Sequence, residues 1–143
     1  MIIMAVDLGD ARTGIAVSDA GESFAFPKEV ISEKGQRALL TKLNLAAQKY
    51  SAEIIVVGLP LNMDGTRGYK AEQCGQTAQK LAAICAAEVV MWDERSTTVM
   101  AHKNLSELNV RGSKRKSSVD SEAAAILLES YLNYRKNQKG GNK

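Results

Sequence analysis

The feature that most constrains the fold is a short, uninterrupted apolar run at residues 54–57, Ile-Ile-Val-Val, which ends in Gly58. A run of this length without polar alternation is typical of a central strand that is covered on both faces. Apolar residues at helical spacing precede it over residues 35–50 and follow it over residues 70–87. A further strand is expected at residues 88–92. Because a parallel pair of strands needs a long crossover, this order predicts parallel pairing.

The N-terminal part of the chain is predicted to contain three more strands, joined by short turns into an antiparallel meander. These strands are expected at residues 2–6, 15–17 and 24–30, with a turn at residues 9–13. Beyond Thr97 we expect a helix to about Leu108, a basic loop, and a last helix from about Ser118 to Tyr134. The sequence therefore predicts an α/β domain with a five-stranded mixed sheet, a three-strand antiparallel meander plus two parallel strands, flanked by helices.

The length of 143 residues suits one domain with its own core. We expect this domain to span residues 1–138, and residues 139–143, Lys-Gly-Gly-Asn-Lys, to form a flexible tail. No apolar stretch approaches the roughly 20 residues of a membrane helix. The N-terminus lacks the basic segment and the cleavage site of a secretory signal. These features predict a cytoplasmic protein that does not enter a membrane.

The two cysteines and the single histidine exclude two common structural devices. Cys74 and Cys85 lie on one predicted helix, about 16 Å apart along its axis, whereas a disulfide tolerates at most about 7 Å between Cα atoms. With His102 alone and no Cys-x-x-Cys pair, structural zinc has no plausible ligand set. Both cysteines are expected to be reduced thiols of the core.

The charge of the chain is divided unevenly between its two parts. Residues 1–99 carry 10 basic and 12 acidic side chains, whereas residues 100–143 carry 9 basic and 4 acidic side chains. The densest basic run is Arg111-Gly-Ser-Lys-Arg-Lys. Cations in such a run can bind a polyanion and release its counterions. A solvated loop explains the same run, and charge alone does not separate the two interpretations.

Acidic residues follow two of the predicted strands. Asp7 follows the first strand, and Asp93 and Glu94 follow the strand at residues 88–92. Because neighbouring parallel strands end side by side, these acids are expected at one edge of the sheet. Alternatives remain open, since Asp7 can cap its own turn, Asp93 can cap a helix, and Glu94 can pair with Arg95.

A third acid opens the last predicted helix. Asp120 precedes Ala124, Leu127 and Tyr131 at helical spacing, which places it on the stripe that faces the sheet. The alternative is specific, because a capping box that starts at Ser117 would leave Asp120 closing the helix N-terminus. Three acids at one edge would supply the hard oxygen ligands that Mg²⁺ or Mn²⁺ prefers. Two such ions, about 3.5–4 Å apart, catalyse in-line phosphoryl displacement. The combined pattern predicts metal-dependent cleavage of a nucleic-acid backbone.

Four short segments carry the acids and the glycine-containing loops. They read Asp7-Leu-Gly-Asp-Ala-Arg-Thr-Gly, Gly58-Leu-Pro-Leu-Asn-Met-Asp-Gly-Thr, Asp93-Glu-Arg-Ser-Thr-Thr and Asp120-Ser-Glu-Ala-Ala-Ala. In this order they resemble the bacterial YqgF/RuvX family, and the resemblance runs from Asp7 to Leu132. It implies an RNase H-like fold related to RuvC-type Holliday junction resolvases, and a nuclease that matures the 5′ end of pre-16S ribosomal RNA.

By position, the resemblance implies that Asp7, Glu94 and Asp120 form the catalytic acidic triad and hold Mg²⁺ or Mn²⁺. Arg12 and Lys116 match basic positions near the site. The cations expected to contact nucleic acid are Arg12, Arg95, Lys114, Arg115 and Lys116. The expected structural loop positions are Gly9, Gly14, Gly58, Asn62 and Gly65.

Two positions depart from the related patterns. Ser96 stands where the family commonly has a bulky apolar residue, and Ala123 stands where RuvC-type resolvases have a further aspartate. The expected partner is therefore pre-rRNA, with structured DNA such as a Holliday junction as the alternative, and the expected state is a monomer or a homodimer.

Two other function classes remain as alternatives. One is a noncatalytic nucleic-acid-binding factor in ribosome assembly or transcription, which would bind without cutting. The other takes Asp7-x-Gly-x-x-x-x-Gly as the phosphate loop of sugar kinases, actin and heat-shock chaperones. Those proteins close two domains around ATP, whereas this chain has room for one.

Overall fold

The computed structural model describes residues 1–9, 11–33, 35–94 and 115–141, with the side chains of the last helix described from Ser121 to Gln138. Five strands and three helices lie within these residues. They are β1 (Ile3–Leu8), β2 (Arg12–Ser18), β3 (Ala25–Ser32), α1 (Gln36–Lys49), β4 (Ile54–Leu59), α2 (Tyr69–Ile84), β5 (Glu88–Asp93) and α4 (Arg115–Gly141).

The strands form one mixed sheet in the order β3-β2-β1-β4-β5. β1, β2 and β3 pair antiparallel, and β1, β4 and β5 pair parallel. The predicted meander with two parallel strands is therefore confirmed. β4 lies between β1 and β5, so the uninterrupted apolar run 54–57 forms a central strand, as its composition predicts.

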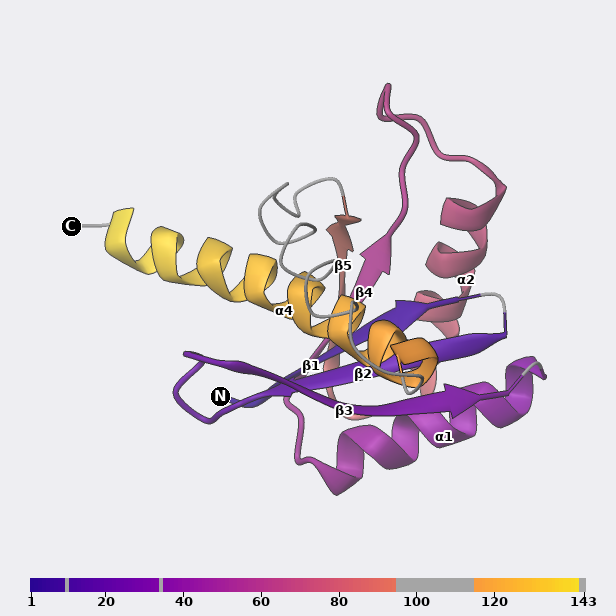
Figure 1. The fold of residues 1–143 in the computed structure, drawn as a ribbon, viewed down its shortest axis with the longest axis horizontal. Helices are drawn as coiled ribbons and strands as arrows, with labels where there is room; N and C mark the ends of the chain where they lie inside the picture. The colour runs from indigo at the N-terminus through magenta and orange to yellow at the C-terminus, as the bar shows by residue number, and fades with distance from the viewer. Residues whose placement is uncertain (10, 34, 95–114, 142–143) are drawn as a thin grey trace.

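Helices cover both faces of the sheet, with α1 and α2 on one side and α4 across the other (Figure 1). The alternation of β1 shows how the strands serve both layers. Met4 and Val6 pack with α1 and α2, whereas Ile3 and Ala5 pack with α4. All four of these side chains are fully buried. Two apolar layers therefore hold the sheet from either side.

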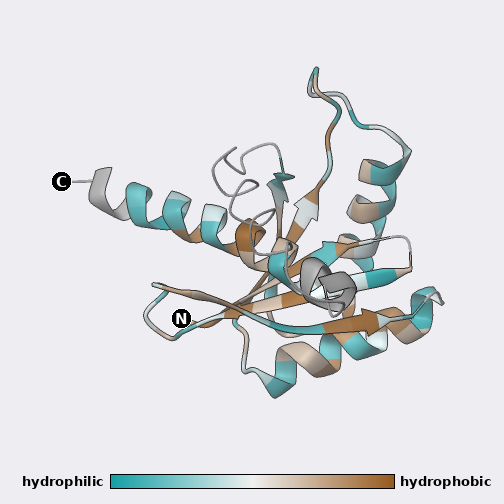
Figure 2. Cartoon of the chain, viewed as in Figure 1, coloured by the Kyte–Doolittle hydropathy of each residue, from teal (hydrophilic) through white to brown (hydrophobic). Residues whose placement is uncertain are grey.

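Hydropathy follows this layering along the chain. Figure 2 shows hydrophobic residues concentrated on the strands, while hydrophilic residues cover much of the C-terminal half of α4. No helix among the described residues is long and apolar enough to cross a membrane. Cys74 and Cys85 are both free thiols, as predicted.

Several element boundaries differ from those that the sequence predicts. β1 continues to Leu8, so Asp7 lies inside the strand, and β2 already begins at Arg12. The cause is strand pairing, because Asp7 pairs with Gly14 and Leu8 with Thr13, which extends both strands into the expected turn. The helix expected to reach Leu108 lies outside the described residues.

The last helix is longer at both ends than its apolar periodicity predicts. α4 begins at Arg115, so the backbone of Arg115 and Lys116 is helical and does not belong to a loop. Ser117 lies inside the helix, and a capping box starting there is therefore not formed. The polar C-terminal turns continue to Gly141 because Lys, Asn and Gln are compatible with a solvated helix. The domain boundary at residue 138 stays a prediction.

Candidate active site

The carboxyl ends of β1, β4 and β5 meet at one edge of the sheet, and two acids occupy that edge. Asp7 is the penultimate residue of β1, and Glu94 directly follows β5. β4 separates the two strands, and its Gly58 pairs with Trp92 of β5. A contact between the two acids must therefore form across the end of β4.

Gly58 provides the space for that contact. A Cβ atom built on Gly58 would lie 2.7 Å from Oε1 of Glu94 and 3.1 Å from its Cγ and Cδ. Real Cβ atoms essentially never approach another heavy atom so closely, so any larger residue would displace the Glu94 side chain. The missing side chain of Gly58, inside the central strand, therefore leaves the room that the Glu94 side chain occupies.

Asp7 and Glu94 interact directly through their carboxyl groups. The pKa of Glu94 is raised to about 7 by burial, by a side-chain hydrogen bond to Asp7 and by the negative charge of Asp7. The positive charge of Lys70 opposes this shift, and Asp93 adds to it. Near neutral pH the pair therefore shares a proton in the absence of a cation.

The thiol of Cys74 lies on the α2 side of the same edge. Burial raises the pKa of Cys74 to about 11, and the negative charges of Glu94 and Asp7 act in the same direction. Only 2% of this residue is exposed. The thiol is therefore protonated at neutral pH and unreactive.

The β1–β2 turn has a tight geometry beside Asp7. The N–H of Gly9 donates a hydrogen bond to the carbonyl oxygen of Arg12 over 2.9 Å. A Cβ atom built on Gly9 would lie 2.3 Å from that oxygen, so only glycine fits. Arg12 begins β2 at this turn, which places it at the same edge as Asp7.

The β4–α2 loop is closed by its own polar contacts. Asn62 donates from its backbone N–H to the carbonyl of Thr66, and the N–H of Gly65 donates to the carbonyl of Asn62, both over 2.9 Å. Gly65 has a φ of 87°, a conformation that favours glycine. Both residues thus shape a loop, as predicted. Gly14 and Gly58, which were predicted to be loop positions, lie inside β2 and β4 because strand pairing extends to them.

The remaining predicted residues are only partly described. Asp120 belongs to α4 one helical turn before Ala124, which is fully buried against the sheet. The side chain of Asp120 lies outside the described part, as do those of Arg115 and Lys116. Arg95 and Lys114 lie outside it entirely.

Lys70 is a residue of the site that the sequence did not single out. It is half-buried in the first turn of α2, and its charge acts on both Glu94 and Cys74. The helical pattern of residues 70–87 places a lysine there without indicating what it faces. A neighbouring cation becomes apparent only when α2 is packed against the ends of β1 and β5.

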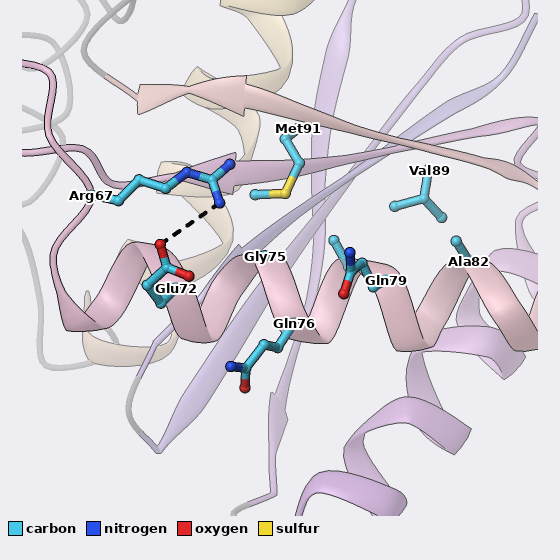
Figure 3. Close-up of a pocket in the computed structure, with 9 residues that line it drawn as sticks. Arg67, Glu72, Gly75, Gln76, Gln79, Ala82, Val89 and Met91 are labelled. Atoms are coloured by element: carbon cyan, nitrogen blue, oxygen red, sulfur yellow. Dashed lines mark ion pairs between the residues drawn. The ribbon is translucent and has the colours of Figure 1, made fainter.

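Two hollows flank α2. The first, which we call the α1–α2 groove, has a volume of about 300 Å³ and is lined by Gly9, Gln36, Tyr69, Lys70 and Gln73 among others. The second lies between α2 and β5, has a volume of about 350 Å³, and includes the apolar side chains of Val89 and Met91 (Figure 3). At one end of this second hollow, Arg67 Nη1 lies 3.9 Å from Glu72 Oε1.

The donor chemistry of the edge fits a divalent cation. The described residues contain no group of three or more potential metal ligands. Within them, however, the carboxyl groups of Asp7 and Glu94 lie together. The raised pKa of Glu94 shows that ionising both groups is unfavourable. Hard carboxylate oxygens are the ligands that Mg²⁺ and Mn²⁺ prefer, and a cation would relieve the repulsion.

Related sequences cover almost the whole chain. The sequence profile of RuvX, described as a Holliday junction resolvase, matches residues 1–134. A relative from Ruminiclostridium cellulolyticum is 36% identical over 133 residues, which cover 92% of this chain and 94% of the relative. A relative from Halothermothrix orenii is 40% identical over 140 residues, which cover 98% of this chain and 100% of the relative. Both relatives carry the name "Putative pre-16S rRNA nuclease".

Solved structures with the same fold include two resolvases. Thermus thermophilus RuvC in complex with a Holliday junction substrate superposes with a TM-score of 0.62 at 14% identity, covering 95% of this chain and 96% of RuvC. The Fowlpox virus resolvase with its Holliday junction DNA gives a TM-score of 0.53 at 12% identity, covering 94% of this chain and 99% of the resolvase. At these identities the likeness shows the fold, and it confirms the predicted RNase H-like architecture.

Proposed function

The chain belongs to the RuvX family, and from this premise we propose that it is a nuclease that hydrolyses phosphodiester bonds in the 5′-end processing of pre-16S ribosomal RNA. The names of its relatives support the reaction and the substrate. The single observation that carries the proposal is the Asp7–Glu94 carboxyl pair at the sheet edge. A metal-dependent hydrolase can use such a pair of neighbouring carboxyl groups to hold a cation.

Three acids are assigned to the catalytic centre in this proposal. Asp7, Glu94 and, from α4, Asp120 would hold Mg²⁺ or Mn²⁺, which supplies an activated water and charge stabilisation for phosphoryl displacement. Lys70 partly balances the negative charge of the pair. Gly58 leaves the space that the Glu94 carboxyl occupies.

Cations outside the acidic pair are proposed to hold the substrate backbone. Arg12 begins β2 beside the site, and Arg115 and Lys116 open α4 after Lys114. We assign these residues, with Arg95, to sequence-independent phosphate contacts. Action on a ribosomal precursor would place the protein in the cytoplasm, as a monomer or a homodimer.

Holliday junction resolution is the second candidate. The description of the RuvX profile and the fold shared with two resolvases favour it. The aspartate that RuvC-type resolvases carry one turn after the last acid is Ala123 here, which favours the rRNA reaction. The two candidates share the same acids and differ in the nucleic acid that the surface accepts.

A cleavage assay tests both candidates together. The substrates are a 5′-extended 16S rRNA fragment and a synthetic four-way DNA junction, each with Mg²⁺, Mn²⁺ or EDTA. We expect cleavage of the RNA that requires a metal and is lost in Asp7→Asn. The matched control is Asp19→Asn, because Asp19 lies in the turn after β2, at the opposite end of the sheet.

Each outcome assigns a function. Metal-dependent cleavage of the junction, with the RNA left intact, would select resolution over rRNA processing. Binding of either substrate without cleavage under any metal would refute the nuclease and favour a noncatalytic binding factor. Cleavage that survives Asp7→Asn would show that the acid pair is not the catalytic centre.

A further inference from the structure

The α1–α2 groove lies beside the acid pair, but Asp7 and Glu94 are not among its lining residues. Gly9, two residues after Asp7, lines the groove, as does Cys74, on which Asp7 and Glu94 both act electrostatically. The groove therefore begins where the proposed cleavage site ends. A strand whose phosphate lies at Asp7 and Glu94 can extend directly into it.

The lining of the groove combines an aromatic ring with amide groups. Tyr69, the first residue of α2, is 80% exposed, and Gln73 one turn later donates from Nε2 to its hydroxyl oxygen over 3.0 Å. Across the groove, Gln36 of α1 donates from Nε2 to Oγ1 of Thr77 over 3.1 Å. Ring and amides are thus held by local hydrogen bonds and need little reordering on binding.

The lining of the groove also includes a cation that acts on the acid pair. Lys70 lines the groove, and its charge acts on Glu94. An exposed ring for stacking, amides for base or sugar hydroxyl groups, and an ammonium group for a phosphate are what an unpaired RNA nucleotide requires. The volume of about 300 Å³ is at the lower end of the range for small-ligand sites.

The neighbouring hollow between α2 and β5 lacks this combination. Its cation, Arg67, is paired with Glu72, and its inner wall includes Val89 and Met91 (Figure 3). Gln76 points away from Met91 in this view, and it lines the α1–α2 groove as well. Of these two hollows, the α1–α2 groove is therefore the one whose lining includes an aromatic ring together with amide groups.

We propose that the α1–α2 groove is a subsite for one unpaired nucleotide of the RNA strand, next to the bond that the acids cleave. Tyr69 stacks on the base, Gln36 and Gln73 contact its polar edge or the 2′-hydroxyl, and Lys70 contacts the adjoining phosphate. This subsite rests on the proposed nuclease function for its substrate, and it makes Tyr69 and Lys70 positioning residues. It favours a single-stranded segment over a perfect duplex at the cleaved position.

Binding in EDTA tests the subsite separately from cleavage. The probe is a short fluorescein-labelled single-stranded RNA with the sequence of the 5′ extension, and its affinity is measured by anisotropy. We expect Tyr69→Leu to weaken binding about tenfold, because stacking on one aromatic side chain is lost. Tyr69→Phe retains the ring and should stay within about twofold of wild type. Phe24→Leu, at another exposed aromatic residue, is the control and should not change binding.

Two further pairs of variants on α2 test the contributions of hydrogen bonding and of charge to RNA binding. Gln73→Leu should weaken binding a few-fold, whereas Gln79→Leu, an exposed residue of the second hollow, should not. Lys70→Gln should lower the slope of log affinity against log salt by about 0.7, the value for one phosphate contact on a single strand. Lys80→Gln, an exposed lysine of the same helix, should leave that slope unchanged.

The results distinguish failure of the subsite from failure of the nuclease. The subsite is refuted if wild type does not bind the RNA, or if Tyr69→Leu binds as well as wild type with an unchanged thermal midpoint. The nuclease proposal would still stand in that case if the RNA is cleaved. If the binding pattern appears but no substrate is cut, the subsite stands and the nuclease proposal fails.

Discussion

Glu22 and Glu94 lie at opposite ends of the sheet and meet opposite surroundings. Oε1 of Glu22 accepts a hydrogen bond from Nε of Arg135 over 2.6 Å, and its side chain is 12% exposed. Glu94 faces the carboxyl group of Asp7, and its pKa rises to about 7. The first arrangement stabilises a charged carboxylate, and the second makes the charged form costly.

Asp19 extends the contrast at the Glu22 end. The backbone N–H of Phe24 donates to this carboxylate over 2.8 Å and lowers its pKa, and the N–H of Ser23 adds a second bond. This end of the sheet therefore uses its acids to hold a turn. The other end places two carboxyl groups against each other, an arrangement that the proposed binding of a cation would explain.

The largest expected effect is a difference in cleavage rate between variants of Glu94 and of Glu22. Glu94→Gln should lower the initial rate of metal-dependent RNA cleavage about a thousandfold, because it removes a carboxylate that is proposed to hold the metal. Glu22→Gln, at the opposite end, should leave the rate within about twofold. Equal losses in the two variants would show that cleavage depends on the fold of both ends and not on the acid pair.

The next effect concerns the space beside Gly58 of β4, which the Glu94 side chain occupies. Gly58→Ala should lower cleavage about 10- to 100-fold, since the new Cβ displaces the Glu94 carboxyl from its position. Gly35→Ala is the matched control, because a Cβ at Gly35 meets nothing within 4 Å. Steady-state rates and a urea unfolding curve for each variant measure the effect. A normal cleavage rate in Gly58→Ala would show that the reaction does not depend on this position of the Glu94 carboxyl.

A smaller effect is expected on stability at the Glu22 end. Removing the carboxylate with Glu22→Gln should lower the free energy of unfolding by about 1–2 kcal/mol, a value between those of exposed and buried pairs. Arg135 is 22% exposed and would lose its charged partner. The exposed pair of Lys42 and Glu33, 3.0 Å apart, provides the comparison, and Lys42→Ala should cost less than about 0.5 kcal/mol. Urea unfolding at neutral pH measures both.

The pH dependence of stability tests the Asp7–Glu94 pair without metal. Because the pKa of Glu94 is about 7 when folded and 4.5 ordinarily, its stabilising contribution is present below pH 4.5 and is lost as the pH rises to 7. The shift corresponds to about 3 kcal/mol, which solvent screening of the half-buried carboxyl reduces to about 1–2 kcal/mol. Urea unfolding in EDTA at about pH 5 and about pH 8 should show this loss in wild type. Glu94→Gln should remove it, and an equal loss in both proteins would assign it to other groups.

The sequence by itself determined the five strands, their division into an antiparallel meander and two parallel strands, and the acids to examine. Local apolar patterns are enough for this, because an uninterrupted run such as 54–57 can be satisfied only inside a sheet covered on both faces. Asp7 and Glu94 were both identified because each follows or ends an apolar run. The predicted start of α4 was wrong. The residues before Ser118 are polar, so no apolar periodicity indicates a helix there.

Only the tertiary structure decided how the acids meet and what surrounds them. The hydrogen bond between Glu94 and Asp7, the space left by Gly58 and the nearness of Lys70 all depend on strands and a helix that are distant in the sequence. Their geometry follows from the order β1-β4-β5 and from the packing of α2, which local periodicity does not encode. Residue types and their spacing specify which groups can react, and the pairing of β4 with β1 and β5 brings those groups together.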